Sequence, residues 1–270
     1  MKIIISIFMA VLFSTINLSA QDEKVDVDEI ARRMSNPTLP MMNVTTFLEY
    51  QSFTGDLPGA DDQSLWMFAL QPPLPFPITK TRNLIIRPLI PFLFNQPVYS
   101  LNGFESSGFQ LGNISLDVLY GGTDKSGLLT GFGMVLTMPT ATNADIRSNW
   151  SIGPSGMIGI MRKWGVFLLL ATQSWDISGE IKTSKLGGQY AIAFSLPGGW
   201  QLVSSPPFSY NWDTKELTLP IGGGPFRTIM IGSTPVKLGF MAFYYVSQPD
   251  AFGPKWMVRF QIQPSLTRPW

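Results

Sequence analysis

The sequence contains no cysteine and no histidine, and only 14% of its 270 residues are charged. Without cysteine there is no disulfide, no thiol nucleophile and no cysteine metal site. Without histidine, the commonest general base and the commonest zinc ligand are both missing. Soluble domains carry about 25% charged residues, so the low charge indicates an unusual solvent. The net charge of +1 gives no electrostatic reason to expect a nucleic-acid partner.

The lack of histidine also bears on catalysis, and we expect neither an enzyme nor a bound cofactor or metal. A Ser-His arrangement is impossible, and no motif positions a Ser-Lys pair, although composition alone does not exclude one. The glycine-rich stretches "WSIGPSG" (150–156) and "LPIGGG" (219–224) are followed neither by a helix pattern nor by GKS or GKT. They therefore predict no phosphate-binding loop, and the glycines at 222–224 favour strand curvature or a bulge.

Long apolar runs are missing except at the N-terminus. The stretch "MKIIISIFMAVLFSTINLSA" (1–20) has a positive Lys2, an apolar core at 3–13 and small residues at 18–20. This pattern predicts a secretory signal peptide cleaved after Ala20. A transmembrane anchor is the weaker alternative, because the apolar run is shorter than the ~20 residues that a span needs. Beyond it, no apolar run is long enough to predict a membrane-spanning helix.

The only strongly charged stretch is "DEKVDVDEIARRMSN" (22–36). A capping position at Asp28 and the following Pro37 predict a short helix between them. We treat residues 21–40 as an N-terminal arm with two interpretations open, a solvated terminal segment or a docked plug. Residues 41–270 are expected to form one β-barrel domain.

What the sequence does contain is a series of apolar segments separated by turn residues. In "KWMVRFQIQ" (255–263), an apolar face with Trp256 and Phe260 alternates with a polar face that includes Arg259. A period of two predicts a strand, although "WGVFLLLA" (164–171) is apolar on both faces and its period does not exclude a helix. The twelve predicted strand segments are 42–54, 62–74, 82–95, 108–121, 127–138, 150–162, 164–175, 185–196, 199–211, 216–231, 235–247 and 255–267.

The connections between these segments alternate in length. Tight links occur at 78–83, 121–126, 162–163, 197–199 and 232–234, and longer links occur between them. Short turns at one end and long loops at the other are typical of an outer-membrane barrel, whereas a soluble sandwich has no reason to keep this alternation. An even strand number would return both termini to the short-turn side, which faces the periplasm.

The sequence therefore predicts an all-β fold: a transmembrane, antiparallel, up-and-down β-barrel of about twelve strands in the outer membrane of a Gram-negative bacterium. Every backbone group in hydrocarbon must be paired, so the sheet must close, with its apolar stripe on lipid and its polar stripe on a lumen. Aromatic residues near strand ends fit interfacial girdles, with core filling as the alternative. Prolines cannot donate to a ladder, so Pro88 and Pro91 predict a bulge or irregular ladder in the third strand.

Polar residues with inward parity are the candidates for a lumen lining. A charge facing mid-bilayer lipid costs about 2–4 kcal/mol, so charged residues in strands should point inward. The candidate solute-lining residues are Glu49, Arg87, Asp117, Gln189, Lys237, Arg259 and Gln261, with neutral companions Gln51, Asn113, Gln173 and Gln263. Two interpretations stay open: the charges pair with one another and stiffen the barrel, or they form a lining that filters or binds solute.

Eight stretches in order give the chain a likeness to a known family. They are "IARRMSNPTLPMMNV" (30–44), "NLIIRPLIPF" (83–92), "SSGFQLGNISLDVLY" (106–120), "GFGMVLTMPTAT" (131–142), "WSIGPSG" (150–156), "PGGWQLVSSPPFSYNW" (197–212), "LTLPIGGG" (217–224) and "GPKWMVRFQI" (253–262). On these the chain resembles the bacterial outer-membrane barrels related to the meta-pathway phenol-degradation protein. The resemblance implies a barrel that transports small compounds, apolar or aromatic ones among them, and it supplies no catalytic residues.

The C-terminus departs from the usual barrel pattern, because Pro264 and Pro269 interrupt the approach to the terminal Trp270. The signal for the barrel-assembly machinery is then expected in "WMVRFQI" (256–262). Three functions are compatible with the sequence. The first is a narrow passive channel for an unknown small solute, partly closed by the arm, and the second is a structural or adhesive barrel that acts through its external loops, above all 95–108. A soluble lipocalin-like carrier is the third, and the apolar outward stripes argue against it.

Overall fold

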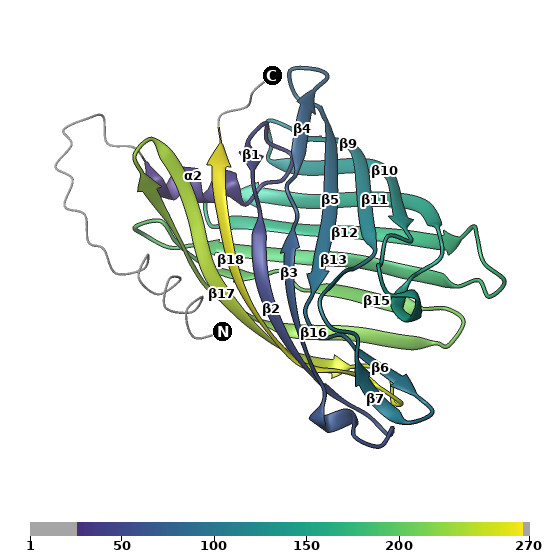
Figure 1. Cartoon of the computed structure of the whole chain (residues 1–270). Helices are drawn as coiled ribbons and strands as arrows, with labels where there is room; N and C mark the ends of the chain where they lie inside the picture. The colour runs from purple at the N-terminus through teal and green to yellow at the C-terminus, as the bar shows by residue number, and fades with distance from the viewer. Residues whose placement is uncertain (1–25, 267–270) are drawn as a thin grey trace.

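The computed structural model describes residues 26–266, which form a closed antiparallel β-barrel with a short helix at one end (Figure 1). The predicted signal peptide with its cleavage site and the terminal Trp270 lie outside the described residues. Within 26–266, twelve barrel strands follow one another around the wall in chain order, and the last pairs with the first. The sheet therefore has no free edge, and the predicted all-β barrel is confirmed. No helix in this part of the chain is long and apolar enough to cross a membrane.

Ten of the twelve barrel strands are continuous along the described chain, and two are interrupted. The continuous strands are β2 (Thr46–Thr54), β5 (Asn83–Leu93), β9 (Ile114–Thr123), β10 (Leu128–Met138), β11 (Ser151–Arg162), β12 (Gly165–Asp176), β13 (Ser184–Ser195), β16 (Glu216–Ile231), β17 (Thr234–Ser247) and β18 (Gly253–Leu266). The interrupted strands are β3 (Ser64–Leu70) with β4 (Leu74–Pro77), and β14 (Trp200–Ser204) with β15 (Pro207–Asn211). The smaller elements are helix α2 (Val27–Met34), the 3-10 turns η1 (Ala60–Asp62) and η2 (Ala144–Ile146), and the short strands β1 (Met42–Asn43), β6 (Pro97–Ser100), β7 (Gly103–Ser106) and β8 (Gln110–Leu111).

Both interruptions of the barrel strands fall at prolines. Pro72 and Pro73 separate β3 from β4, and Pro206 separates β14 from β15. A proline has no N–H to donate, so each of these positions removes one hydrogen bond that the ladder would otherwise have. The sheet nevertheless stays closed, because β4 resumes pairing with β5 and β15 resumes pairing with both of its neighbours.

The predicted irregularity of the third strand is found beside that strand rather than in it. β5 runs through Pro88 and Pro91 without a break. On one side the gap between β3 and β4 lies opposite Pro88. On the other side, residues 112–114 lie opposite only residues 90–91, between the last β5–β9 pair and the first β5–β8 pair. The extra residue therefore belongs to the neighbouring segment, which bends around the two prolines.

Side chains of the barrel strands alternate between an exposed outer face and a buried inner face. In β18, Phe260 is 49% exposed while its neighbour Arg259 is 6% exposed. In β12, Phe167 is exposed while Val166 and Leu168 are buried, so the segment that is apolar on both faces is a strand and its inner face is apolar. The apolar stripe lies outside, where it can contact hydrocarbon, as the alternation predicted.

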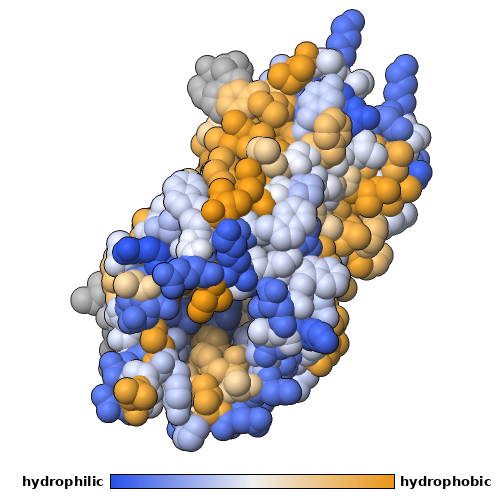
Figure 2. All heavy atoms as spheres, turned by 90° about the vertical axis from the view of Figure 1, so that its right-hand side faces the viewer, coloured by the Kyte–Doolittle hydropathy of each residue, from blue (hydrophilic) through white to orange (hydrophobic). Residues whose placement is uncertain are grey.

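Tryptophan side chains lie at both ends of the outer face, whereas other aromatic side chains, such as Phe226 and Phe243, are buried in the interior. Trp164 and Trp200, near the short turns, and Trp175 and Trp212, near the long loops, are each between 42% and 50% exposed. Such positions suit the two interfacial girdles of a membrane barrel. Figure 2 shows one side of the barrel, where apolar residues gather over its upper part and hydrophilic residues surround a hollow nearer the long loops.

The two ends of the barrel differ as predicted. Tight turns join β4 to β5, β9 to β10, β11 to β12, β13 to β14 and β16 to β17, and longer loops lie at the other end. In the β9–β10 turn, Asp124 accepts hydrogen bonds from Ser126 Oγ at 2.6 Å and from the Leu128 amide at 3.0 Å. These bonds hold the pKa of the Asp124 carboxyl below its usual value. Helix α2 lies at the short-turn end of the barrel (Figure 1). At this end the last residues of β18 pair with β1.

Candidate functional site

The N-terminal arm is docked at the short-turn end of the barrel. Asp26 caps helix α2 by accepting bonds from the amides of Asp28 and Glu29, each at 3.1 Å, as acidic N-caps do. Asp28 Oδ1 in turn accepts a 2.5 Å bond from the Gly199 amide in the β13–β14 turn. The helix contacts β13, β14, β16 and β17. Of the two interpretations of the arm, the structure shows the docked one for the residues from 26 onward.

After the helix, residues 35–38 cross the mouth of the barrel. On one side Lys237 Nζ in β17 donates to Ser35 Oγ at 2.7 Å. On the other side Asn36 Nδ2 donates to Thr123 Oγ1 at the end of β9 (2.8 Å), and Asn83 Nδ2 at the start of β5 donates to the Thr38 carbonyl (2.6 Å). Asn36 and Thr38 are completely buried. The segment thus spans the lumen between β17 and the β5–β9 side.

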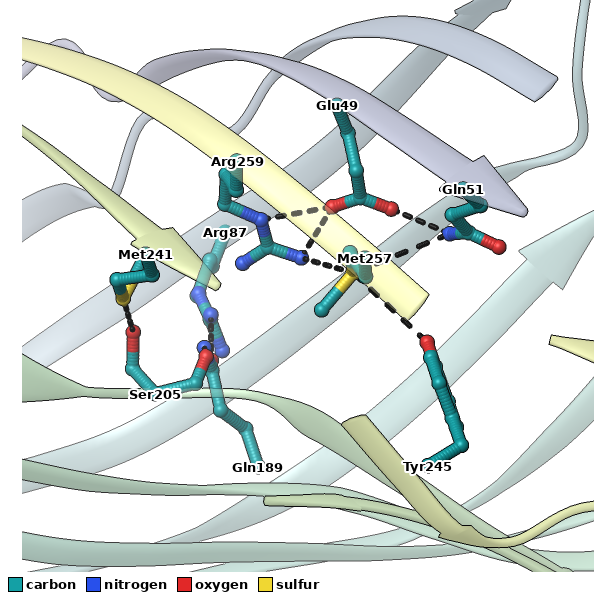
Figure 3. Close-up of polar contacts among 9 residues, drawn as sticks. All are labelled: Glu49, Gln51, Arg87, Gln189, Ser205, Met241, Tyr245, Met257 and Arg259. Atoms are coloured by element: carbon teal, nitrogen blue, oxygen red, sulfur yellow. Dashed lines mark hydrogen bonds and ion pairs between the residues drawn. The ribbon is translucent and has the colours of Figure 1, made fainter. Parts of the chain in front are cut away.

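A buried ion pair joins the first and last barrel strands. Arg259 of β18 and Glu49 of β2 are direct cross-strand partners, with Nη2 and Nε of the arginine 2.6 and 2.7 Å from the carboxylate. Gln51 donates a further bond to the same carboxylate at 2.5 Å. The charged side chains of Arg259 and Glu49 are 7% and 1% exposed, so the pair is buried in the barrel interior (Figure 3).

A second interior pair lies on β5 and β9. Arg87 and Asp117 are cross-strand partners, with Nη1 and Oδ2 3.7 Å apart. Arg87 Nη2 also donates to Gln189 Oε1 of β13 at 2.6 Å, and Gln189 Nε2 donates to the Ser205 carbonyl at 2.8 Å. Because β5 and β13 are separated by four barrel strands, Arg87 and Gln189 form a polar bridge across the lumen (Figure 3).

The third interior cation, Lys237, has neutral partners. Besides Ser35 Oγ, its Nζ lies 5.5 Å from the centre of the Phe226 ring. Among residues 26–266 no carboxylate lies within 4.0 Å of it, and only 4% of the residue is exposed. A buried ammonium group without a counter-charge is costly, because neutral groups replace only part of its hydration.

The interior groups surround a cavity of about 150 Å³. Lys237 of β17 and Arg259, Gln261 and Gln263 of β18 lie on one side of it, and Arg87 and Gln189 join across it. Residues Met34, Ser35 and Pro37 of the arm form part of its boundary. The other wall is apolar, and its larger side chains are Ile85, Leu119, Met157, Val166, Leu168 and Leu170. The lumen is therefore narrow and has one polar and one apolar side.

The candidate lining residues lie inside the barrel. Arg87, Gln189, Lys237, Arg259 and Gln261 border the cavity, whereas Glu49 and Asp117 lie behind two of these cations as their partners. Two of the three cations are thus paired with carboxylates, as the first interpretation of the charges holds. A lining that filters or binds solute stays a prediction.

The neutral companions have different places. Gln51 joins the ion pair, and Gln263 Nε2 donates to the Met34 carbonyl of the arm at 3.0 Å. Asn113 donates to the Ile146 carbonyl in a long loop at 2.8 Å. The inward placement of Gln173 was wrong: it shares the outer face of β12 with the exposed Trp175 and accepts a 2.9 Å bond from Trp212 Nε1. Near a strand end, an outward glutamine meets an interfacial tryptophan rather than hydrocarbon.

The sequence did not predict which residues of the arm form hydrogen bonds with the barrel strands. Ser35, Asn36 and Thr38 have partners 85 to 202 positions away in the chain. Gln201, which lies inside β14 and accepts a bond from Ser35 Oγ at 3.1 Å, was missed too. Short polar residues in an arm carry no period, so no signal in the sequence distinguishes a docked arm from a solvated one.

No protein-family model and no curated protein matches this sequence. Among solved structures, the chain is similar to the COG4313 outer membrane channel from Pseudomonas putida F1, with a TM-score of 0.62 and 12% identity over 92% of this chain and 100% of that one. At that identity the likeness shows the fold alone, which is that of an outer-membrane β-barrel. The resemblance to the phenol-degradation family stays a prediction.

Two other solved structures are less similar to this chain. They are the β domain of the Bordetella autotransporter BrkA (TM-score 0.45, 10% identity, 84% of this chain and 99% of that one) and LpxR from Salmonella typhimurium (0.40, 9%, 81% and 99%). At these TM-scores neither likeness supports a conclusion about this chain.

Proposed function

We propose that this protein is a passive channel of the bacterial outer membrane for small solutes, with apolar and aromatic compounds among them. The observation that carries the proposal is a cavity inside a closed, lipid-compatible barrel, bordered by the cations and glutamines of its inner face. The proposal is also supported by the fold shared with an outer-membrane channel. Insertion by the barrel-assembly machinery, with the signal in 256–262, belongs to the same proposal.

The docked arm makes the described conformation a closed one at the short-turn end. Residues 35–38 are held by hydrogen bonds to β17 on one side and to β5 and β9 on the other. Twelve strands lie between eight, at which side chains fill a barrel, and sixteen, at which a wide aqueous channel opens. We therefore expect a low conductance that rises when the arm leaves the mouth.

Reconstitution in planar lipid bilayers tests the channel. The chain without its predicted signal peptide is compared with a variant that also lacks residues 21–40. We expect small conductance steps from the first and larger ones from the second. The proposal fails if neither protein conducts ions and neither passes solutes into liposomes, although both are folded barrels.

A catalytic function is not proposed, although the structure does bring one serine and one lysine together. Ser35 Oγ and Lys237 Nζ are 2.7 Å apart. The serine hydroxyl is already within 3.1 Å of two acceptors, the Ala31 carbonyl and Gln201 Oε1, so its proton is directed away from the lysine. We expect no labelling of Ser35 by a fluorophosphonate probe, and covalent labelling at Ser35 in intact barrels would contradict this.

A non-transporting barrel that acts through its loops is the second candidate, and one observation favours it. The β6–β7 hairpin carries Leu101 fully exposed at its tip, and Tyr99 packs on Phe104 with ring centres 4.9 Å apart. An apolar side chain on a rigid hairpin suits contact with another surface. Replacing Leu101 and Tyr99 by serine should abolish adhesion of expressing cells and leave conductance unchanged. Unchanged adhesion would remove this candidate.

A further inference from the structure

The walls of the interior cavity carry charge of one sign only. Arg87, Lys237 and Arg259 all border it. Within the described chain, no aspartate or glutamate borders it, because Glu49 and Asp117 lie behind the two arginines. An entering molecule would therefore meet three cationic side chains and no carboxylate. Such a surface attracts anions and repels cations.

The three cations are not equally neutralised. Arg259 is in direct contact with Glu49, and Arg87 is 3.7 Å from Asp117. Among the described residues, Lys237 has only the Ser35 hydroxyl and the face of Phe226 as partners. Three cations against two carboxylates leave the interior group with one unmatched positive charge, and it lies at Lys237. A bound anion would supply the missing counter-charge in a site from which water is largely excluded.

The apolar wall of the cavity selects the rest of the ligand. Leu119, Met157, Leu168 and Leu170 belong to one buried apolar cluster that borders the same cavity. The cavity volume of about 150 Å³ is that of an engineered apolar cavity known to hold benzene. A ligand that satisfies both walls has one negative group and a compact apolar body about the size of a benzene ring.

We propose that this cavity is a binding site for a small organic carboxylate with an apolar body, whose carboxylate pairs with Lys237 Nζ and whose body lies against the Leu119–Met157–Leu168–Leu170 wall. This deepens the channel function by assigning a class to its solute. Ser35 of the arm takes part by holding the lysine, so the site is complete only while the arm is docked.

Calorimetric titration of the detergent-solubilised chain tests the site with three probes of matched shape: benzoate, neutral benzamide and cationic benzylammonium. We expect benzoate to bind, benzamide to bind at least about tenfold more weakly and benzylammonium not to bind, because only benzoate brings a negative charge to the lysine. Equal affinities for benzoate and benzamide, or no binding of benzoate by a folded barrel, would overturn the proposal.

Variants locate the site. Lys237→Met should weaken benzoate binding by at least about tenfold, and Lys237→Arg should restore most of it. Lys185→Met removes an exposed lysine from the same barrel and should leave the affinity for benzoate unchanged. Undiminished binding by folded K237M would place the anion elsewhere and overturn the assignment. If that variant does not fold, as judged by its heat-dependent mobility on a gel, the comparison of benzoate with benzamide on the native chain decides.

Conductance measured on the same preparations separates this proposal from the channel itself. A barrel that conducts but does not distinguish benzoate from benzamide overturns the carboxylate site and leaves the channel standing. A barrel that binds benzoate through Lys237 but never conducts has the site and is not a channel.

Discussion

At the scale of single residues, two arginines in the barrel interior are stabilised in different ways. Arg259 makes two short contacts to Glu49 in a position where both side chains are buried. Arg87 has a longer contact to Asp117 and relies on Gln189 across the lumen. Removing one member of a buried pair leaves an uncompensated charge, whereas removing both leaves none. The tighter pair should therefore show the larger coupling between its members.

Glu49→Gln tests this coupling. The substitution keeps the shape of the side chain and leaves Arg259 unpaired, so we expect a loss of about 3–5 kcal/mol in the free energy of unfolding. The double variant Glu49→Gln with Arg259→Met should lose less than the sum of the two single ones. Urea unfolding from lipid vesicles, followed by tryptophan fluorescence, measures the free energy of unfolding of each variant. Asp61→Asn breaks the exposed pair with Lys255 and should cost at most about 1 kcal/mol; an equal cost for both substitutions would contradict the argument.

At the scale of elements, the strands and the arm differ in how far the sequence determines them. The strands could be predicted because most of them show a period of two. The segment "WGVFLLLA" (164–171), which shows no such period, contains the first part of β12, where it pairs with β11 and β13. The arm could be predicted only as a helix with an end before Pro37. Its docking depends on Asn36 and Thr38 meeting Thr123, 87 and 85 positions away, and no local pattern encodes such contacts. The same holds for Gln173, whose partner Trp212 lies two loops further on.

Asn36→Ala should release the arm, because the asparagine bonds Thr123, the amide of Thr38 and the hydroxyl of Thr38 at once. Each buried group left without a partner costs about 1–3 kcal/mol, so the docked population should fall. Single-channel recordings should then show more frequent or larger openings. Asn102→Ala, at the tip of the β6–β7 hairpin, is the matched control and should leave the recordings unchanged. Native-like recordings from N36A would show that the arm does not close the mouth.

At the scale of the whole molecule, the apolar outer face determines that the barrel is placed in a lipid bilayer rather than in water. Its fold could be predicted in full outline from the alternation of strand faces and of loop lengths. The interior could be predicted only as polar, because parity places side chains on a face but does not tell which of them touch. The cavity and its apolar wall follow from side chains of β5, β9, β11 and β12 that are distant in sequence.

Phe260→Arg places a charge in the middle of β18 on the outer face. If that face contacts hydrocarbon, the substitution should lower the free energy of unfolding from vesicles by about 2–4 kcal/mol. Leu266→Arg, an exposed position on the same strand at its end, should cost only about 0–1 kcal/mol, because charges near the interface are tolerated. Equal small costs at both positions would mean that water, not lipid, touches the outer face.

The pairing of β18 with β2 has a consequence for biogenesis. Because β18 is the last of the described barrel strands and pairs with the first, the sheet cannot close until β18 has been synthesised and exported. β18 also carries Gln263, which bonds the arm at Met34. A product truncated before residue 253 would lack β18, and with it both the pairing that closes the sheet and the hydrogen bond to the arm at Met34. Quality control in the periplasm would then meet an open sheet rather than a closed barrel that leaks.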